Sequence, residues 1–307
     1  MKVLFVCSGN SEYKISPIVQ NQANSLIKAG IEVDFFPIKG KGIVGYLSNV
    51  KKLRKFIKGR KYDIVHAHYY LCGIVASLSG AKPIVVSLMG SDVYAFWLNR
   101  FMIRIFAKIS WNKVIVKTPD LYRKIKLIKS SIVPNGVDMD VFKPVPKEKV
   151  MNQVNFPDGF NIIFVADPSR KEKNFALAEK AVNLLDNTNI HLHKIYKISV
   201  KDLVNYYNAA DLLLLTSLWE GSPNVIKEAM ACNCPIISTK VGDVNRLLEG
   251  IEGCYLSSYD PGNIASQIRK SLEFGGKTTG RNKIIQLGLD SETVAKEIIK
   301  IYKSSIN

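Results

Sequence analysis

Two glutamates, Glu220 and Glu228, stand eight positions apart and are the residues of this chain best placed to do chemistry. A carboxylate can accept hydrogen bonds from the hydroxyl groups of a bound ligand. The apolar run 211–217 before them predicts a buried strand, and residues 224–232 predict a helix. Glu220 would then lie in the loop between strand and helix, and Glu228 about one turn inside the helix.

The predicted start of this helix suits an anion. Ser222 could cap the helix, and Pro223 suits its first turn because the backbone N–H there would be unpaired. Free N–H groups and the helix dipole attract phosphate. The N–H groups that we expect to bind phosphate or sugar oxygens belong to Gly221, Ser222, Asn224 and Val225. Amides for phosphate beside carboxylates for hydroxyls predict a site for a nucleotide sugar.

The segment Glu220–Glu228, continuing to Asp243, resembles the E-x7-E region of the retaining glycosyltransferases of family 4, which have the GT-B fold. Residues 133–144 resemble that family's segment near the domain junction, and residues 207–211 resemble a further family segment. The resemblance covers most of the chain. It implies transfer of a sugar from a nucleoside diphosphate to a hydroxyl, with Glu220 touching the donor sugar and Glu228 binding the ribose.

The resemblance implies donor-binding residues in two further loops. Residues 167–173 follow a predicted strand, where the family carries an arginine and a lysine that neutralise the donor diphosphate. Lys173 matches that lysine, whereas Arg170 lies closer to it than the usual spacing; a solvated basic turn is the alternative for both. Gly9 ends the first predicted strand, where the family has a glycine-containing loop close to the donor, and an ordinary turn is the alternative there.

Acceptor-side candidates follow two other predicted strands. His66 and His68 would lie at a strand end, where they could position or deprotonate an acceptor, or serve as packing or capping residues. Asp92 could bind acceptor or sugar hydroxyls or cap a helix. Met89 stands where many relatives have a histidine that contacts the transferred sugar.

No metal site is expected. The two histidines lack an obvious third ligand, and the neighbouring cysteines Cys232 and Cys234 have no second pair to close a zinc site. We therefore expect no cofactor beyond the nucleotide-sugar substrate, and a reaction that requires no metal.

Alternating strands and helices predict an α/β protein with two doubly wound, Rossmann-like parallel-sheet domains. The predicted strands cover residues 2–7, 31–37, 63–66, 84–88, 160–166, 190–196, 211–216 and 235–239. We expect an acceptor-side domain over residues 1–145 and a donor-binding domain over residues 146–290. The last helix, within residues 291–307, would cross back onto the first domain, as in the resembled family. Ligand would bind in the central cleft, at the carboxyl ends of the strands.

Charge is concentrated in the first half of the chain. Residues 1–150 hold 25 lysines and arginines against 9 aspartates and glutamates, whereas residues 151–307 hold 18 against 17. Two basic helices are predicted there, at 46–58 and at 97–111, and the second carries Arg100, Arg104 and Lys108 on one face beside aromatic residues. Such helices suit an anionic membrane surface, and a solvated helix face is the alternative. No nucleic-acid motif is present, so a nucleic-acid partner is not expected.

Cysteine content and hydropathy bear on location. Five scattered cysteines favour reduced thiols in the cytoplasm. No apolar run approaches the roughly 20 residues of a spanning helix. We therefore expect a cytoplasmic glycosyltransferase, peripheral on the inner face of the cytoplasmic membrane, acting on a lipid-linked or growing polysaccharide acceptor. Two alternatives stay open: a nucleotide-sugar epimerase of the same architecture, and a non-catalytic protein that binds anionic membranes.

Overall fold

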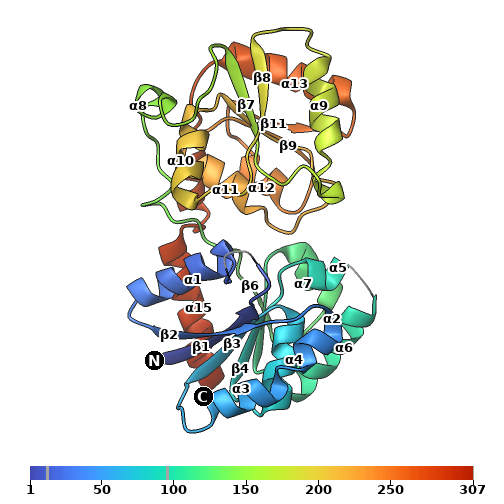
Figure 1. The fold of residues 1–307 in the computed structure, drawn as a ribbon, viewed down its shortest axis with the longest axis vertical. Helices are drawn as coiled ribbons and strands as arrows, with labels where there is room; N and C mark the ends of the chain where they lie inside the picture. Colours follow the sequence, from blue (N-terminus) through green and yellow to red (C-terminus); the bar gives the residue numbers. More distant parts are fainter. Residues whose placement is uncertain (12–13, 95–96, 307) are drawn as a thin grey trace. The chain divides into compact units, whose positions relative to one another are not determined.

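The chain folds into two compact units, shown in Figure 1. The computed structural model describes residues 1–11, 14–94 and 97–306. Unit 1 contains Met1–Gly136 and Ser291–Asn307, and unit 2 contains Val137–Asp290. The expected boundary after residue 145 is therefore too late. The reason is that the Val137 N–H donates to the Leu289 carbonyl and the Phe142 side chain packs in the core of unit 2.

Unit 1 is built on a six-stranded parallel sheet in the order β2-β1-β3-β4-β5-β6. Short apolar runs form these strands because both faces of a parallel sheet are covered by helices. In register, Val3 of β1 pairs with Ile64 of β3 and with Val33 of β2. The strands are β1 (Lys2–Ser8), β2 (Glu32–Ile38), β3 (Ile64–His68), β4 (Ile84–Ser87), β5 (Lys113–Val116) and β6 (Ser130–Ile132).

Helices cover both faces of this sheet (Figure 1). The last helix, α15, packs against α1, β3 and β4, and its Ile298 and Tyr302 join the apolar layer that contains Phe5. The helices are α1 (Pro17–Lys28), α2 (Gly42–Leu47), α3 (Val50–Ile57), α4 (Tyr70–Ser79), α5 (Ser91–Tyr94), α6 (Trp97–Ile109), α7 (Pro119–Ile125) and α15 (Ser291–Ile306).

The basic helix predicted over residues 46–58 is wrong at its start. The structure divides this segment into α2, which ends at Leu47, and α3, which begins at Val50. The Ser48 hydroxyl donates to the Gly45 carbonyl at 2.9 Å, and the Asn49 amide donates to the same carbonyl at 2.8 Å. Side chains that bind nearby backbone groups compete with the helix, and here they interrupt it.

Unit 2 has a five-stranded parallel sheet in the order β11-β10-β9-β7-β8. The chain leaves β7 toward β8 on one side, and β9 lies on the other side of β7. Crossover loops diverge at such a switch point, which is where doubly wound sheets bind ligands. The strands are β7 (Phe160–Phe164), β8 (Ile190–Lys194), β9 (Leu212–Leu215), β10 (Ile236–Thr239) and β11 (Cys254–Ser257).

The helices of unit 2 enclose its sheet between two apolar layers. They are α8 (Lys147–Met151), α9 (Phe175–Asn183), α10 (Val200–Ala209), α11 (Asn224–Ala231), α12 (Val244–Leu248), α13 (Pro261–Phe274) and α14 (Gly280–Gln286), with the short 3-10 helix η1 (Lys171–Lys173). The doubly wound α/β architecture predicted from the sequence is confirmed for both units. No helix in the described part of the chain combines the length and apolar character needed to cross a bilayer.

Candidate functional site

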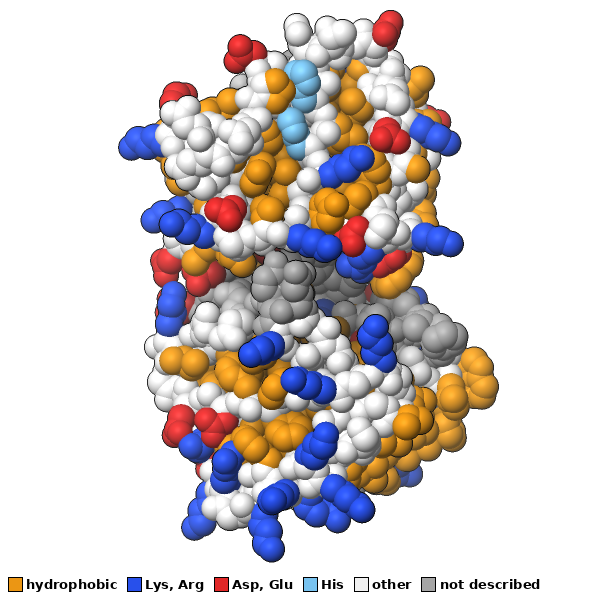
Figure 2. Space-filling model, in the orientation of Figure 1, with side chains coloured by type: hydrophobic (Ala, Val, Ile, Leu, Met, Phe, Trp, Pro, Cys, Tyr) orange, Lys and Arg blue, Asp and Glu red, His pale blue; other side chains and the backbone are white. Residues whose placement is uncertain are grey.

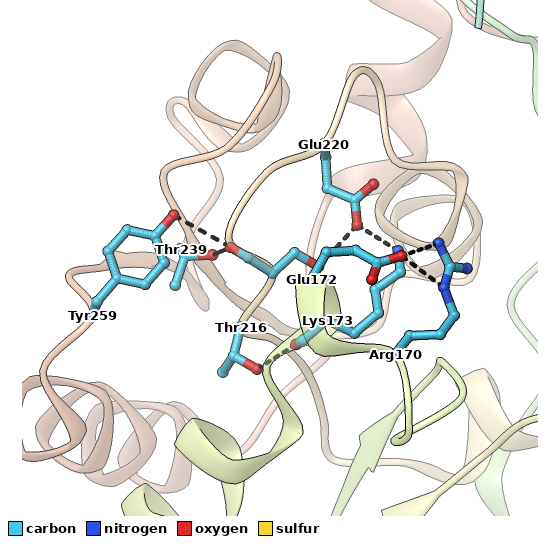
Figure 3. Close-up of polar contacts among 8 residues, drawn as sticks. Arg170, Glu172, Lys173, Thr216, Glu220, Thr239 and Tyr259 are labelled. Atoms are coloured by element: carbon cyan, nitrogen blue, oxygen red, sulfur yellow. Dashed lines mark hydrogen bonds and ion pairs between the residues drawn. The ribbon is translucent and has the colours of Figure 1, made fainter. Parts of the chain in front are cut away.

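The loops after β7 and β9, which flank the switch point of unit 2, are tied together. The Thr216 hydroxyl lies within hydrogen-bond distance of the carbonyls of Lys173, at 3.1 Å, and Asn174, at 2.9 Å. The Leu218 N–H donates to the Glu172 carbonyl at 2.8 Å. Figure 3 shows both loops converging on one place. The strand–loop–helix segment predicted around Glu220 is thereby fixed against the basic loop 167–173.

The centre of the site is an ion pair between Lys173 and Glu220. Lys173 Nζ lies 2.5 Å from Glu220 Oε1, and each side chain is 15% exposed (Figure 3). The Ser217 hydroxyl donates to the same carboxylate oxygen at 2.8 Å. Two donors on one oxygen fix the orientation of the carboxylate and leave its second oxygen for other partners. The two residues predicted separately as diphosphate ligand and sugar contact are therefore brought together.

Arg170 lies on the same loop but pairs elsewhere. Its Nε and Nη2 donate to Glu172 Oε1 at 2.8 and 2.5 Å, and its side chain is 54% exposed. Figure 3 shows it beside Lys173 and not against Glu220. The arginine therefore belongs to the rim of the site in this arrangement.

The start of α11 differs from the prediction. Pro223, and not Ser222, is the N-cap residue, and no side chain caps the helix. The Ser222 hydroxyl donates instead to Asp243 Oδ2 at 2.8 Å. The first-turn N–H groups of α11, which include those of Asn224 and Val225, have no side-chain cap. They therefore remain available to bind an anion.

A small hollow opens at the carboxyl ends of β7 and β9. It is lined by Lys173, Ser217 and Val225, together with residues 164–166 at and after the end of β7 and residues 213–215 of β9. Asn224 precedes Val225, and its side-chain oxygen is buried without a hydrogen-bond partner among the described residues. Lysine, hydroxyl and helix amides thus meet at the position where a doubly wound sheet binds a ligand.

Glu228 is positioned from α10. The Tyr207 hydroxyl donates to Glu228 Oε2 at 2.9 Å. Burial raises the pKa of Glu228, against the Tyr207 hydrogen bond and the nearby Lys227, which lower it. Tyr207 had no predicted role, although residues 207–211 formed one of the segments that resemble the family.

Three further residues that support the site escaped the sequence analysis. Thr239 Oγ1 donates to the Ser217 carbonyl at 2.7 Å, and the Tyr259 hydroxyl lies within hydrogen-bond distance of the same carbonyl, at 3.3 Å (Figure 3). Ser217 itself holds Glu220. The polar strand end at Thr239 was the only sequence signal for this support, because Tyr259 comes from a loop far along the chain.

Gly9 of unit 1 has a packing role. Its N–H donates to the Ile38 carbonyl at 2.7 Å, so this amide is already occupied. A Cβ at this position would lie 2.9 Å from the Pro37 Cβ. The glycine therefore lets the end of β1 approach the end of β2, which agrees with the ordinary-turn alternative.

His66 is buried inside unit 1. Its Nδ1 lies 2.6 Å from the Tyr302 hydroxyl and its Nε2 lies 2.8 Å from Ser87 Oγ. Burial lowers its pKa well below the usual value, with His68 and Lys117 adding to the effect. The ring thus connects β3 to α15 and β4, and it has no exposed surface for an acceptor.

His68, the last residue of β3, is 3% exposed, and neither of its ring nitrogens has a hydrogen-bond partner among the described residues. Its ring lies against Phe5 and His66. Burial lowers its pKa to about 3, and the charge of Lys117 acts in the same direction. His68 is therefore neutral and packed at neutral pH.

Asp92 supports the loop after β4. Its Oδ1 accepts the N–H groups of Met89 and Gly90, each at 2.8 Å, and its side chain is fully buried. Burial raises its pKa to about 6, against these backbone hydrogen bonds. The buried side chain thus holds the loop before α5, a role that differs from both the helix cap and the acceptor contact considered for it. Across the described ranges, no group of three or more histidines, cysteines or carboxylates could hold a metal ion.

Two family models match this chain. Residues 149–273 match Glycosyl transferases group 1, and residues 9–118 match Glycosyl transferase 4-like. The chain is 27% identical over 255 residues to the UDP-Gal:alpha-D-GlcNAc-diphosphoundecaprenol alpha-1,3-galactosyltransferase of Escherichia coli, covering 66% of this chain and 64% of that one. It is 27% identical over 216 residues to TuaC of Bacillus subtilis strain 168, a glycosyltransferase assigned to teichuronic acid biosynthesis, covering 60% and 55%. The chain thus spans less than two thirds of either relative.

Solved structures share the fold. Sucrose-phosphate synthase from Thermosynechococcus elongatus superposes with a TM-score of 0.80 at 16% identity, covering 98% of both chains. Anabaena Alr3699/HepE, crystallised with UDP, superposes with a TM-score of 0.75 at 18% identity, covering 99% of this chain and all of that one. The two family matches and these folds show that the chain belongs to the glycosyltransferases of the family 4 type, which have the GT-B fold.

Proposed function

We propose that the protein transfers a sugar, with retention of its anomeric configuration, from a nucleoside-diphosphate sugar to a hydroxyl of a lipid-linked or growing polysaccharide acceptor. The observation that carries this proposal is the Lys173–Glu220 pair beside the uncapped start of α11. The expectation of retention rests on the resemblance of residues 220–228 to retaining enzymes. Lipid-linked and polysaccharide acceptors are supported by the names of the two bacterial relatives.

In this mechanism unit 2 binds the donor. Lys173 and the first-turn amides of α11 bind the diphosphate, and Glu228 binds the ribose. The bond between the anomeric carbon and the phosphate oxygen breaks, and the nucleoside diphosphate leaves with the bonding electrons. The acceptor hydroxyl forms the new glycosidic bond, and its proton passes to the departing diphosphate oxygen. Glu220, held by Ser217, stabilises the positive charge that develops on the sugar.

The donor can be tested directly. We expect one of UDP, GDP, ADP and CDP to bind in calorimetric titrations, and UDP is the first candidate because solved neighbours were crystallised with it. Glu220→Gln should lower sugar transfer about 100-fold or more with little change in melting temperature. Exposed Glu252→Gln is the matched control. Parent-like transfer by Glu220→Gln would show that the site is assigned wrongly.

The sugar-transfer assay and the nucleotide titrations also separate the alternative functions. Anomeric analysis of the product by NMR tests retention. An epimerase would release a changed nucleotide sugar in the absence of acceptor. A non-catalytic membrane binder would bind none of the four nucleotides.

We further propose that unit 1 binds an anionic membrane surface through α6, from the cytoplasmic side. Trp97, Phe101, Ile105 and Ile109 recur every fourth residue and are 72%, 54%, 37% and 69% exposed. This spacing places them along one side of the helix. Figure 2 shows hydrophobic side chains at the edge of unit 1 where Figure 1 places α6, and lysines and arginines spread over the same unit.

A second helix extends this surface. Val44 of α2 is 82% exposed and Ile43 is 55% exposed, and both α2 and α6 pack against α4. The exposed basic residues of neighbouring α3 are Lys51, Lys52, Arg54 and Lys55. Apolar side chains that enter the headgroup region beside a basic helix suit anionic lipid.

Vesicle sedimentation tests this surface. We expect binding to phosphatidylglycerol vesicles that weakens as salt rises, because part of the attraction is electrostatic. The pair Phe101→Ser and Ile109→Ser should weaken it about tenfold or more. Leu184→Ser, an equally exposed leucine of unit 2, is the matched control. Equal loss in both variants, or binding that ignores salt and lipid charge, would contradict the proposal.

A further inference from the structure

The loop that carries Glu220 is held at its far end by a buried ionic group. Lys227 is 1% exposed, and its Nζ donates to Ser222 Oγ at 3.2 Å. Ser222 Oγ donates in turn to Asp243 Oδ2 at 2.8 Å, and Asp243 is 7% exposed. A lysine and an aspartate are rarely buried this deeply, and their burial costs free energy that apolar residues would not cost.

The backbone of the same loop rests on the turn before α12. Gly242 has φ +54, and a Cβ there would overlap the Gly221 carbonyl oxygen and lie 3.1 Å from the Glu220 carbonyl oxygen. The loop is thus fixed at three successive residues: Glu220 by Lys173, Gly221 by Gly242, and Ser222 by the buried pair.

We propose that Lys227 and Asp243 are positioning residues that act through Ser222 to hold the loop 220–222 in the geometry needed for sugar transfer. The inference rests on the proposed function, because only that function gives the loop geometry a catalytic role. The contacts of Ser222 with Lys227 and Asp243, which we call the clamp, are present in the ligand-free protein. Neither residue touches the Glu220 carboxylate. Their effect is to limit the motion of a loop whose displacement by about 1 Å would cost a large factor in rate.

The charges around Lys227 make this clamp dependent on pH. Burial lowers the pKa of Lys227 to about 8, and Arg246 acts in the same direction, whereas Asp243 and Glu228 raise it. The ammonium is therefore mostly present at pH 7 and mostly lost at pH 9. The attraction between Lys227 and Asp243 weakens over the same interval, so the loop should loosen.

The burial of Lys227 also provides a way to distinguish a role in catalysis from a role in stability. Because the folded-state pKa of Lys227 is depressed, the unfolded chain binds more protons between about pH 8 and its usual value of 10.5, and the buried charge weakens the fold below pH 8. The double variant Lys227→Met with Asp243→Asn removes both charges and keeps an acceptor for Ser222. It should fold at least as stably as the parent, as replaced buried ion pairs often do.

Hydrogen exchange on the ligand-free protein tests the clamp without any substrate. In the double variant, amides 217–222 should exchange about tenfold faster than in the parent at pH 7, with an unchanged or higher melting temperature. Between pH 7 and pH 9, the exchange rates of the same amides should rise in the parent by more than the intrinsic exchange rate does. In the double variant they should rise only with the intrinsic rate. Lys240→Met, an exposed lysine on the same turn, is the matched control.

A second measurement connects the clamp to the reaction. With UDP-glucose as the probe donor, the double variant should turn over about tenfold more slowly while its UDP dissociation constant stays within about twofold of the parent value. Unchanged exchange in the loop would overturn the clamp, as would faster exchange throughout unit 2 with a lower melting temperature. If the parent binds no UDP, the exchange experiment still decides the clamp, and the proposed donor fails separately.

Discussion

Replacing Lys173 should weaken nucleotide binding, whereas replacing its partner Glu220 should not. In the ligand-free protein the ammonium is held by the carboxylate at 2.5 Å, so a diphosphate must compete with Glu220 for Lys173. Lys173→Met removes the proposed phosphate ligand itself. Glu220→Gln removes the competitor and a negative charge beside the diphosphate, and it keeps an acceptor for Ser217.

The magnitudes follow from the contacts. A charge-assisted hydrogen bond to phosphate contributes about 1.5–3 kcal/mol, and the competing pair reduces this toward the lower end. Lys173→Met should therefore weaken UDP about tenfold, whereas Glu220→Gln should leave UDP affinity equal or up to about threefold tighter. The burial of this ion pair is intermediate between that of an exposed pair and that of a fully buried pair. Its loss in Lys173→Met should therefore lower the free energy of unfolding by about 2 kcal/mol, which lowers the melting temperature by about 4–8 °C for a unit of this size.

Calorimetric titration of UDP into parent and variants at one fixed salt concentration makes the comparison. Lys171→Met, an exposed lysine of the same loop, should bind UDP like the parent and reports the general effect of losing one positive charge. The reasoning is refuted if Lys173→Met binds UDP within twofold of the parent. It is also refuted if both members of the pair, when replaced, weaken binding to the same extent.

Three further outcomes are expected. Gly242→Ala should lower UDP-glucose turnover about tenfold or more in steady-state assays, because its methyl group would displace the Gly221 carbonyl; parent-like turnover would contradict the loop packing. Acid should destabilise unit 1: His68 has a folded-state pKa of about 3, so the unfolded chain takes up its proton first as pH falls below about 6.5, and this residue alone should cost about 2 kcal/mol at pH 5 relative to neutral pH. Urea unfolding of the parent and of His68→Leu at pH 7.5 and pH 5 measures the difference, and equal pH slopes would exclude His68 as the cause. EDTA should leave turnover unchanged, because in the proposed mechanism Lys173 and the α11 amides supply the positive charge for the diphosphate; loss of turnover that magnesium restores would show a metal requirement.

Most of the secondary structure around the site was predictable because its signals are local. The run of leucines that forms β9 and the turn residues 220–223 before α11 are signals that act over a few residues. The structure places β9 and α11 within two residues of the predicted bounds. The details that failed depend on partners elsewhere. Ser222 has the right chemistry for a cap, but Asp243 supplies an acceptor that the local sequence does not reveal.

The histidines illustrate the same limit in unit 1. A strand end that carries His66 and His68 suggests catalytic chemistry, because histidine titrates near neutral pH. Helix α15 returns from the end of the chain and packs against β3, where the Tyr302 hydroxyl lies 2.6 Å from His66 Nδ1, 236 positions away in the sequence. Burial then removes the charged form and the access that a general base needs.

The sequence by itself determined two doubly wound α/β units, the elements that carry Glu220 and Glu228, and the concentration of positive charge in the first half. These follow from apolar periodicity, turn residues and composition, which need no knowledge of distant contacts. The tertiary structure decided which charges meet: Lys173 with Glu220 across 47 positions, and Lys227 with Asp243 through Ser222. Such pairings depend on how crossover loops converge at the edge of a sheet, and sequence order alone does not contain that arrangement.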